Sequence, residues 1–293
     1  MANLPLVIPP ELARHPFRAR RSLTDPPGIE QARELLAGVL AEIRQAKQKL
    51  DVRENEDWWY RGQGGAFELR PGLFRLLERD FNQREHDPKS IYELEYDLYF
   101  EFACRGPGMQ EAGLTSWDKL FCMQHHRLPT RLLDWSEHLG MALFFALTAA
   151  GRPEEGVPTI WILAPGRLNE IVCKDRDLYS PRYLGYDWEH NQDRDYEDYL
   201  IREAGKFNWE GPVAIYPEQK NVRMRSQHGL FTIFGKDTRP LEQQQPEVVC
   251  RIEIPEAAVP AAKEFLAEAG LDEALVYPDL DGFARALRTR YGI

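Results

Sequence analysis

The densest group of side chains capable of chemistry lies between residues 123 and 136, in the run MQHHRLPTRLLDWS. Apolar segments flank this run, which holds two histidines, two arginines, an aspartate and a serine. Imidazole groups titrate near neutral pH and can transfer protons, while guanidinium groups bind phosphates and carboxylates. Loops that carry such groups commonly form binding or catalytic sites. We therefore expect a site that includes His125, His126, Arg131, Asp134 and Ser136.

A second polar anchor lies at residues 57–63, where the sequence reads DWWYRGQ. Arg61 follows three aromatic residues and precedes a glycine, which predicts a strand end that opens into a turn. The planar fork of an arginine there could bind a phosphate or carboxylate, and Gly62 would let the ligand approach the backbone. An equally weighted alternative is that Arg61 pairs with a buried carboxylate such as Asp134 and only holds the fold.

Spacing within the first run leads to three further expectations. Arg131 and Asp134 are three residues apart and flank two leucines, so we expect a locally buried salt bridge between them. Neighbouring residues such as His125 and His126 point about 100° apart on a helix, which does not favour a shared metal ion, so no metal is expected. Either histidine could form hydrogen bonds or transfer protons in a cleft, or form a buried hydrogen bond to Asp134.

Composition narrows the class of protein. The chain has 293 residues, 43% of them hydrophobic, and can bury a large core. Its formal net charge of -10 argues against broad binding of nucleic acid, which is not expected as a bulk partner. No stretch approaches membrane-spanning length, so no membrane partner is expected. The four cysteines lack a CxxC pair, which favours free thiols in a reducing compartment and a cytoplasmic location; they are Cys104, Cys122, Cys173 and Cys250.

Hydrophobic periodicity predicts an α+β fold with one mixed, largely antiparallel sheet and helices packed around it. We divide the chain into an irregular segment at 1–28, a leading helix at 29–50 and one domain at 51–293. Predicted helices follow at 69–80, 91–104, 117–126, 141–150, 261–269 and 280–291, the fourth ending at Gly151 and the last capped by Asp279. Predicted strands lie at 58–63, 159–163, 213–216, 229–234 and 248–254, with a further strand ending in Ser136. The sheet is therefore expected mostly C-terminal to the helical part.

These motifs resemble those of the FRG domain family, which is named for an aromatic-Arg-Gly motif. The resemblance rests on Tyr60-Arg61-Gly62 and on QHHRLPTRLLDWS at 124–136. Further matches are LRPGLFR at 69–75, RSQHGLFT at 225–232 and YPDLDG at 277–282. The resemblance runs in the expected order from about residue 58 to the C-terminal helix.

The order of the motifs is also distantly similar to that of the Arg-Ser-Glu class of ADP-ribosyltransferases. The resemblance implies a cleft that binds NAD, with Arg61 contacting a phosphate or ribose and Ser136 supporting that arginine or the ligand. The third motif of the class is a glutamate that stabilises positive charge on the ribose. The matching region offers Gln227 and His228 but no glutamate, unless Glu247 or Glu253 substitutes.

The resemblance implies an enzyme that cleaves the nicotinamide-ribose bond of NAD and transfers ADP-ribose to an unknown macromolecular acceptor or to water. Such an activity would suit a bacterial toxin or anti-phage effector. The candidate catalytic residues are Arg61, Ser136, Gln227 and His126. The candidate ligand-binding residues are Tyr60, Gly62, Gln63, His125, Arg131, Asp134 and His228. The alternative is a non-catalytic module that senses a nucleotide or a protein, and a metal-dependent nuclease or phosphoesterase ranks third.

Overall fold

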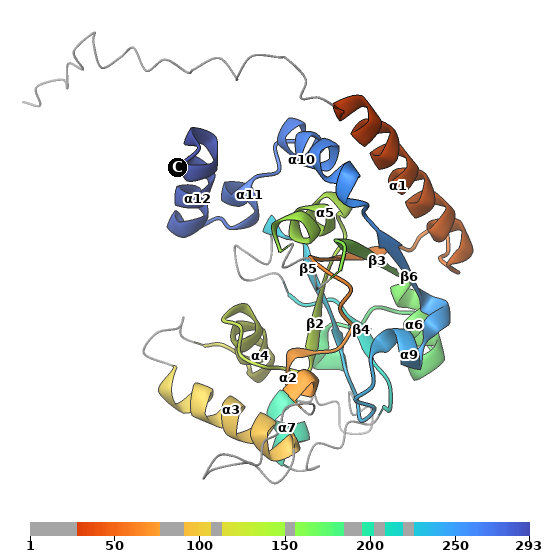
Figure 1. The fold of residues 1–293 in the computed structure, drawn as a ribbon. Coiled ribbons are helices and arrows are strands. Elements are labelled where there is room, and N and C mark those ends of the chain that lie inside the picture. Colours follow the sequence, from red (N-terminus) through yellow and green to blue (C-terminus); the bar gives the residue numbers. More distant parts are fainter. Residues whose placement is uncertain are drawn as a thin grey trace, which may run out of the picture.

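The fold is built on one open, six-stranded sheet with the strand order β4-β5-β2-β1-β3-β6 (Figure 1). The computed structural model describes residues 28–76, 91–106, 113–149, 156–184, 195–201, 209–218 and 226–293. The strands are β1 (Trp59–Gln63), β2 (Leu132–Ser136), β3 (Thr159–Leu163), β4 (Val213–Ile215), β5 (Gly229–Ile233) and β6 (Val249–Glu253). The expected α+β class with a single sheet is confirmed.

The topology corrects one expectation about the sheet. All five pairs of neighbouring strands are antiparallel, so the sheet is not mixed. Four of the six strands lie in the C-terminal half, as expected, while β1 and β2 lie at the centre of the sheet. These two strands pair at Tyr60 and Ser136, which brings the two sequence motifs into direct contact.

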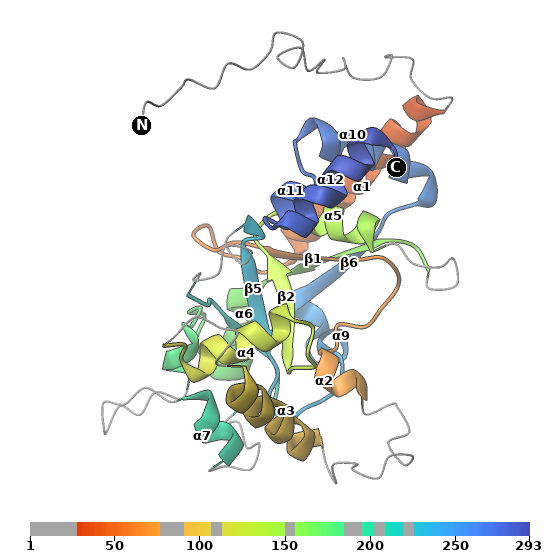
Figure 2. The ribbon, with the colours of Figure 1, turned by 90° about the vertical axis from the view of Figure 1, so that its left-hand side faces the viewer.

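Helices cover both faces of the sheet (Figures 1 and 2). The helices α1 (Ile29–Lys49), α5 (Leu139–Thr148) and α10 (Val259–Glu268) share one hydrophobic core with Tyr60, Ile160 and Ile252. A second core joins β4 and β5 to α3 (Ile91–Arg105), α4 (Ser116–His125) and α7 (Tyr196–Ile201). The opposite face packs against α2 (Gly72–Arg75), α6 (Pro165–Cys173) and α9 (Leu241–Gln244).

The C-terminal part adds a pair of helices, α11 (Glu273–Val276) and α12 (Leu280–Tyr291). Asp279 caps α12 as predicted, because its side chain accepts a hydrogen bond of 2.6 Å from the Gly282 amide. Three short 3-10 turns complete the described elements, at η4 (Pro181–Tyr183), η5 (Pro246–Val248) and η6 (Glu256–Ala258).

Most helices that the periodicity predicts are present, with small shifts at their ends. α1 buries Leu36, Val39 and Ile43 on one face, as its spacing predicts. α5 begins two residues earlier than expected, and its predicted end at Gly151 lies outside the described residues. The same holds for residues 1–27 and for the end of the helix predicted at 69–80, of which α2 is the described part. Among the described helices, none is both long and apolar enough to cross a membrane.

Candidate functional site

Arg61 and Asp134 form the centre of the candidate site. β1 ends at Gln63, as the strand predicted at 58–63 does, and Arg61 is the third of its five residues, so this arginine lies within the strand and not at its end. Its Nη1 donates a hydrogen bond of 2.8 Å to the main-chain oxygen of Asp134 and lies 3.5 Å from Asp134 Oδ2. The pairing proposed as the structural alternative is thus present. The carboxylate is not buried, however, because 53% of the Asp134 side chain is exposed.

The Arg61 guanidinium keeps one donor unused. Its Nε is buried and has no hydrogen-bond partner among the described residues, although 18% of the whole side chain is exposed. Burial lowers the pKa of Arg61, the nearby positive charge of Arg75 adds to this effect, and Asp134 opposes it. A partly desolvated cation with an unused N–H is suited to an oxygen acceptor on an anionic ligand.

Asp134 is held by residues of the preceding helix and loop. Gln124, near the end of α4, donates a hydrogen bond of 2.8 Å from Nε2 to Asp134 Oδ2. The Thr130 hydroxyl donates in turn to Gln124 Oε1. We call Arg61, Gln124, Thr130 and Asp134 the Asp134 network. Sequence analysis missed Gln124 and Thr130, although both belong to the motif at 124–136.

Arg131 has a structural role, and its predicted salt bridge with Asp134 was wrong. Arg131 is fully buried and forms an ion pair with Glu95 of α3, which is also buried. Its Nη1 donates to the main-chain oxygens of Phe234 at 2.8 Å and Gly235 at 3.1 Å. Burial alone would lower the pKa of Arg131, but the Glu95 carboxylate outweighs it and raises the pKa. These contacts tie the loop before β2 to α3 and to the end of β5.

Ser136 joins the end of β2 to the segment that enters β5. Its hydroxyl donates a hydrogen bond of 2.8 Å to the Gln227 main-chain oxygen and accepts one of 3.1 Å from the His138 amide. The Gln227 side chain donates from Nε2 to the main-chain oxygen of Val276, at the end of α11, over 2.9 Å. Both residues therefore lie at the same end of the sheet.

Four more polar side chains gather there, because β2 and β4 end where β5 begins. We call Glu137, His138, Tyr216 and His228 the sheet-end cluster. The rings of His138 and His228 have centroids 4.0 Å apart. His228 Nδ1 lies 3.5 Å from Glu137 Oε2. Of the four, sequence analysis named only His228, and the available signal for two others was the Glu-His pair that directly follows Ser136.

Contacts within the cluster shift the pKa values of two of its members. Burial and the neighbouring His228 lower the pKa of His138, with Glu137 opposing, so His138 favours its neutral form. Burial and the Glu137 carboxylate raise the pKa of Tyr216. His228 also has a φ of 45°, in the left-handed region that residues other than glycine rarely adopt. Backbone strain of this kind is common at functional sites.

The remaining candidate residues lie elsewhere. Tyr60 is buried in the core beneath α5, and Gln63 accepts a hydrogen bond of 2.8 Å from Trp161 Nε1. The space beside Gly62 is filled by α5, because a Cβ there would lie 1.7 Å from the Ala142 oxygen. His125 and His126 lie at the C-terminal end of α4, with perpendicular rings 4.9 Å apart.

Neither substitute for the third-motif glutamate lies beside Ser136. Glu253 is on the edge strand β6, and both β3 and β1 separate that strand from β2. Glu247 lies in η5, the turn that leads into β6. Within the described residues, no group of three or more His, Cys, Asp or Glu side chains could hold a metal ion.

Comparison with known proteins finds one family model that matches part of the chain. The family model of the FRG domain matches residues 56–155, a range that contains Arg61, the Asp134 network, Ser136, Glu137 and His138. No curated protein and no solved structure matches the chain.

Proposed function

The chain carries an FRG domain at residues 56–155, and from this premise we propose that it binds NAD and cleaves the nicotinamide-ribose bond. ADP-ribose would then pass to a macromolecular acceptor or to water. The observation that carries the proposal is the position of a carboxylate, Glu137, which follows Ser136 and lies beside His228, at the point where β2 pairs with the strand that carries Arg61.

Arg61 binds NAD in this proposal. The diphosphate and ribose groups of NAD offer oxygen acceptors for the Arg61 guanidinium, whose side chain is 18% exposed and whose Nε has no partner among the described residues. A charge-assisted hydrogen bond in a partly desolvated position is stronger than one in water. Asp134 holds the guanidinium through its main-chain oxygen, so the donor is oriented before the ligand arrives.

Glu137 supplies the charge that Gln227 lacks. Positive charge develops on the ribose as nicotinamide leaves, and a nearby carboxylate stabilises it, as in glycoside hydrolysis. Arg61 follows Tyr60 and Glu137 follows Ser136 on paired antiparallel strands, which separates the two residues by about 7 Å along the strands. A ligand bound through its phosphates at Arg61 could therefore extend toward Glu137.

The two histidines of the sheet-end cluster suit activation of the acceptor. The pKa of His138 is lowered by burial and by His228, which keeps its imidazole neutral at pH 7 and able to accept a proton. Water or a hydroxyl group on a macromolecule would be deprotonated as it attacks the ribose. His126 is exposed at the end of α4 and is available to an acceptor on that side.

Nicotinamide release from NAD, followed by chromatography, tests the proposal. Glu137→Gln is expected to reduce the rate by about a hundredfold or more while NAD still binds, because the charge acts mainly in the transition state. Arg61→Ala is expected to abolish binding in calorimetry. The matched controls are the exposed residues Glu268 and Arg44, changed to Gln and Ala, which should leave rate and binding unchanged.

The same experiment separates the alternative, a non-catalytic module that senses a nucleotide or a protein. NAD binding that depends on Arg61 without any nicotinamide release, with or without a cell extract, would establish the sensing role instead. Wild-type protein that neither binds nor cleaves NAD would contradict the NAD proposal in both forms.

A further inference from the structure

The C-terminal helix α12 stands at one end of the molecule and packs against α11 (Figures 1 and 2). Its buried side carries small residues, Gly282 and Ala286. A Cβ at position 282 would lie 2.0 Å from the Tyr277 oxygen, so the two helices meet at close range. The packing against α11 therefore uses a narrow side of α12 and leaves its larger apolar side chains on another side.

Those larger side chains form an exposed stripe. The α12 stripe consists of the exposed Leu280, Phe283, Ala284 and Tyr291 and the half-buried Leu287, which fall within about 100° of the helix circumference. Leu280 is 85% exposed, Phe283 53% and Tyr291 68%. Contiguous apolar side chains at this spacing are typical of a helix that packs against another helix.

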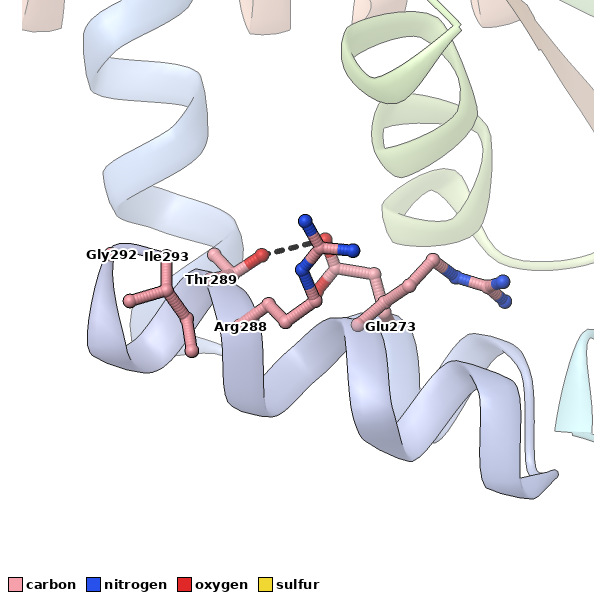
Figure 3. A pocket seen from close by; sticks show the side chains of 6 residues that line it. Glu273, Arg288, Thr289, Gly292 and Ile293 are labelled. Atoms are coloured by element: carbon pink, nitrogen blue, oxygen red, sulfur yellow. Dashed lines mark hydrogen bonds between the residues drawn. The ribbon is translucent and has the colours of Figure 1, made fainter.

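Charged residues lie beside the stripe, with an acidic residue near the start of α12 and a basic residue near its end. Asp281 lies in the first turn of α12, and Arg288 lies in the last turn. Their separation of seven residues corresponds to about two turns, so both side chains lie on the same flank of the stripe. Figure 3 shows Arg288 beside Glu273 and Thr289, where α11 and α12 line a shallow hollow of about 300 Å³.

We propose that a second copy of this chain packs on the α12 stripe, antiparallel and related by a twofold axis. The axis would pass between residues 284 and 285, close to the middle of the stripe, and would place Asp281 of one copy level with Arg288 of the other. A twofold axis keeps the same flank on the same side while reversing the helix direction. Asp281 of each copy then faces Arg288 of the other, which gives two ion pairs.

Charge order favours a second copy over an anionic lipid surface. A lipid surface would attract Arg288 and Arg290 in the last turn but repel Asp281 and Asp279, which lie at the other end of the helix. A second antiparallel copy satisfies both ends at once, because each acidic end meets a basic end. The stripe is thus complementary to itself, as an interface between identical subunits requires.

Sedimentation equilibrium of the purified chain tests the interface. The wild type is expected to dimerise, and Phe283→Asp is expected to weaken the dimer at least tenfold. The matched control is Phe67→Asp, which changes another exposed phenylalanine in the loop after β1. Circular dichroism should show the same helix content in all three proteins.

A charge exchange makes the test specific for the antiparallel pair. Asp281→Arg and Arg288→Asp should each be monomeric alone, because like charges then face each other. Mixing the two variants should restore a dimer that contains one copy of each. A dimer that persists in Phe283→Asp and in both single charge variants would overturn the proposal. A wild type that is monomeric at all concentrations would also overturn the proposal. The same holds for a monomeric wild type that co-sediments with vesicles of anionic phospholipid.

Discussion

Two arginines of the same motif region show how environment separates a structural residue from a candidate ligand-binding one. Arg131 is fully buried and donates to the Glu95 carboxylate and to two main-chain oxygens. Arg61 donates to Asp134 but keeps a buried Nε without a partner among the described residues. A ligand would therefore compete with protein acceptors at Arg131, whereas at Arg61 it would satisfy a donor that folding leaves unused.

The buried ion pair leads to a prediction about stability. Glu95→Gln should lower the free energy of unfolding by about 3–5 kcal/mol, because it leaves the buried Arg131 charge without a counterion. Urea denaturation followed by circular dichroism measures the change. Glu101→Gln, on the exposed side of the same helix, removes an i,i+4 pair with Arg105 and should change stability by less than about 0.5 kcal/mol. Equal losses in the two variants would contradict the assigned role of Arg131.

The wrong partner for Arg131 has a physical reason. A spacing of three residues brings side chains together on a helix, but residues three apart in a strand point to opposite faces. The segment that begins after Arg131 is the strand β2, so Asp134 could not lie beside it. Glu95 lies 36 residues earlier in the chain, and no local pattern indicates that contact.

At the scale of elements, Gly62 fixes how α5 lies on the sheet. A Cβ at this position would lie 1.7 Å from the Ala142 oxygen and 2.7 Å from the Ala146 nitrogen, both main-chain atoms of α5. The glycine beside Arg61 therefore serves close packing of a helix on β1. This explains why the aromatic-Arg-Gly motif does not end the strand, as its glycine suggested.

Replacing this glycine should move α5 away from β1. Gly62→Ala is expected to destabilise the protein by about 3 kcal/mol, because main-chain atoms cannot yield as side chains do. Gly38→Ala is the matched control, since this exposed position in α1 has no atom within 4 Å of the added methyl group. That change should stabilise the protein by about 0.5–1 kcal/mol through the better helix propensity of alanine. Thermal unfolding should show a lower stability for Gly62→Ala and a higher stability for Gly38→Ala. A loss of stability in both variants would count against this role of Gly62.

The sequence predicts where helices and strands lie along the chain better than it predicts how they are arranged in space. The helical periodicity of α1 and α4 located these helices to within about two residues, because each buries a stripe against a core. Strand order could not be predicted, since antiparallel neighbours here come from distant parts of the chain, such as β2 and β5. The sheet-end cluster depends on that order, which is why Tyr216 was missed.

At the scale of the whole molecule, the sheet extends well beyond the matched residues 56–155. That range contains β1 and β2, whose other neighbours are β3 and β5. The helix α1 lies before the range and buries six residues in the core that it shares with α5 and α10. Arg33 of α1 also donates to Glu264 of α10, over 2.9 Å and 2.8 Å. Both flanking regions therefore contribute to the core on which the site rests.

Three fragments test how much of the chain forms one cooperative unit. Residues 28–293 should unfold in a single transition, like the full chain, because they contain every described element. Residues 51–293 should unfold at a lower temperature, since the loss of α1 uncovers apolar side chains of β6 and α10. Residues 56–155 should show no cooperative transition, because β1 and β2 meet at one residue pair and their other partners are absent. Calorimetry measures all three, and a cooperative transition in 56–155 would mean that the matched segment folds without the rest of the sheet.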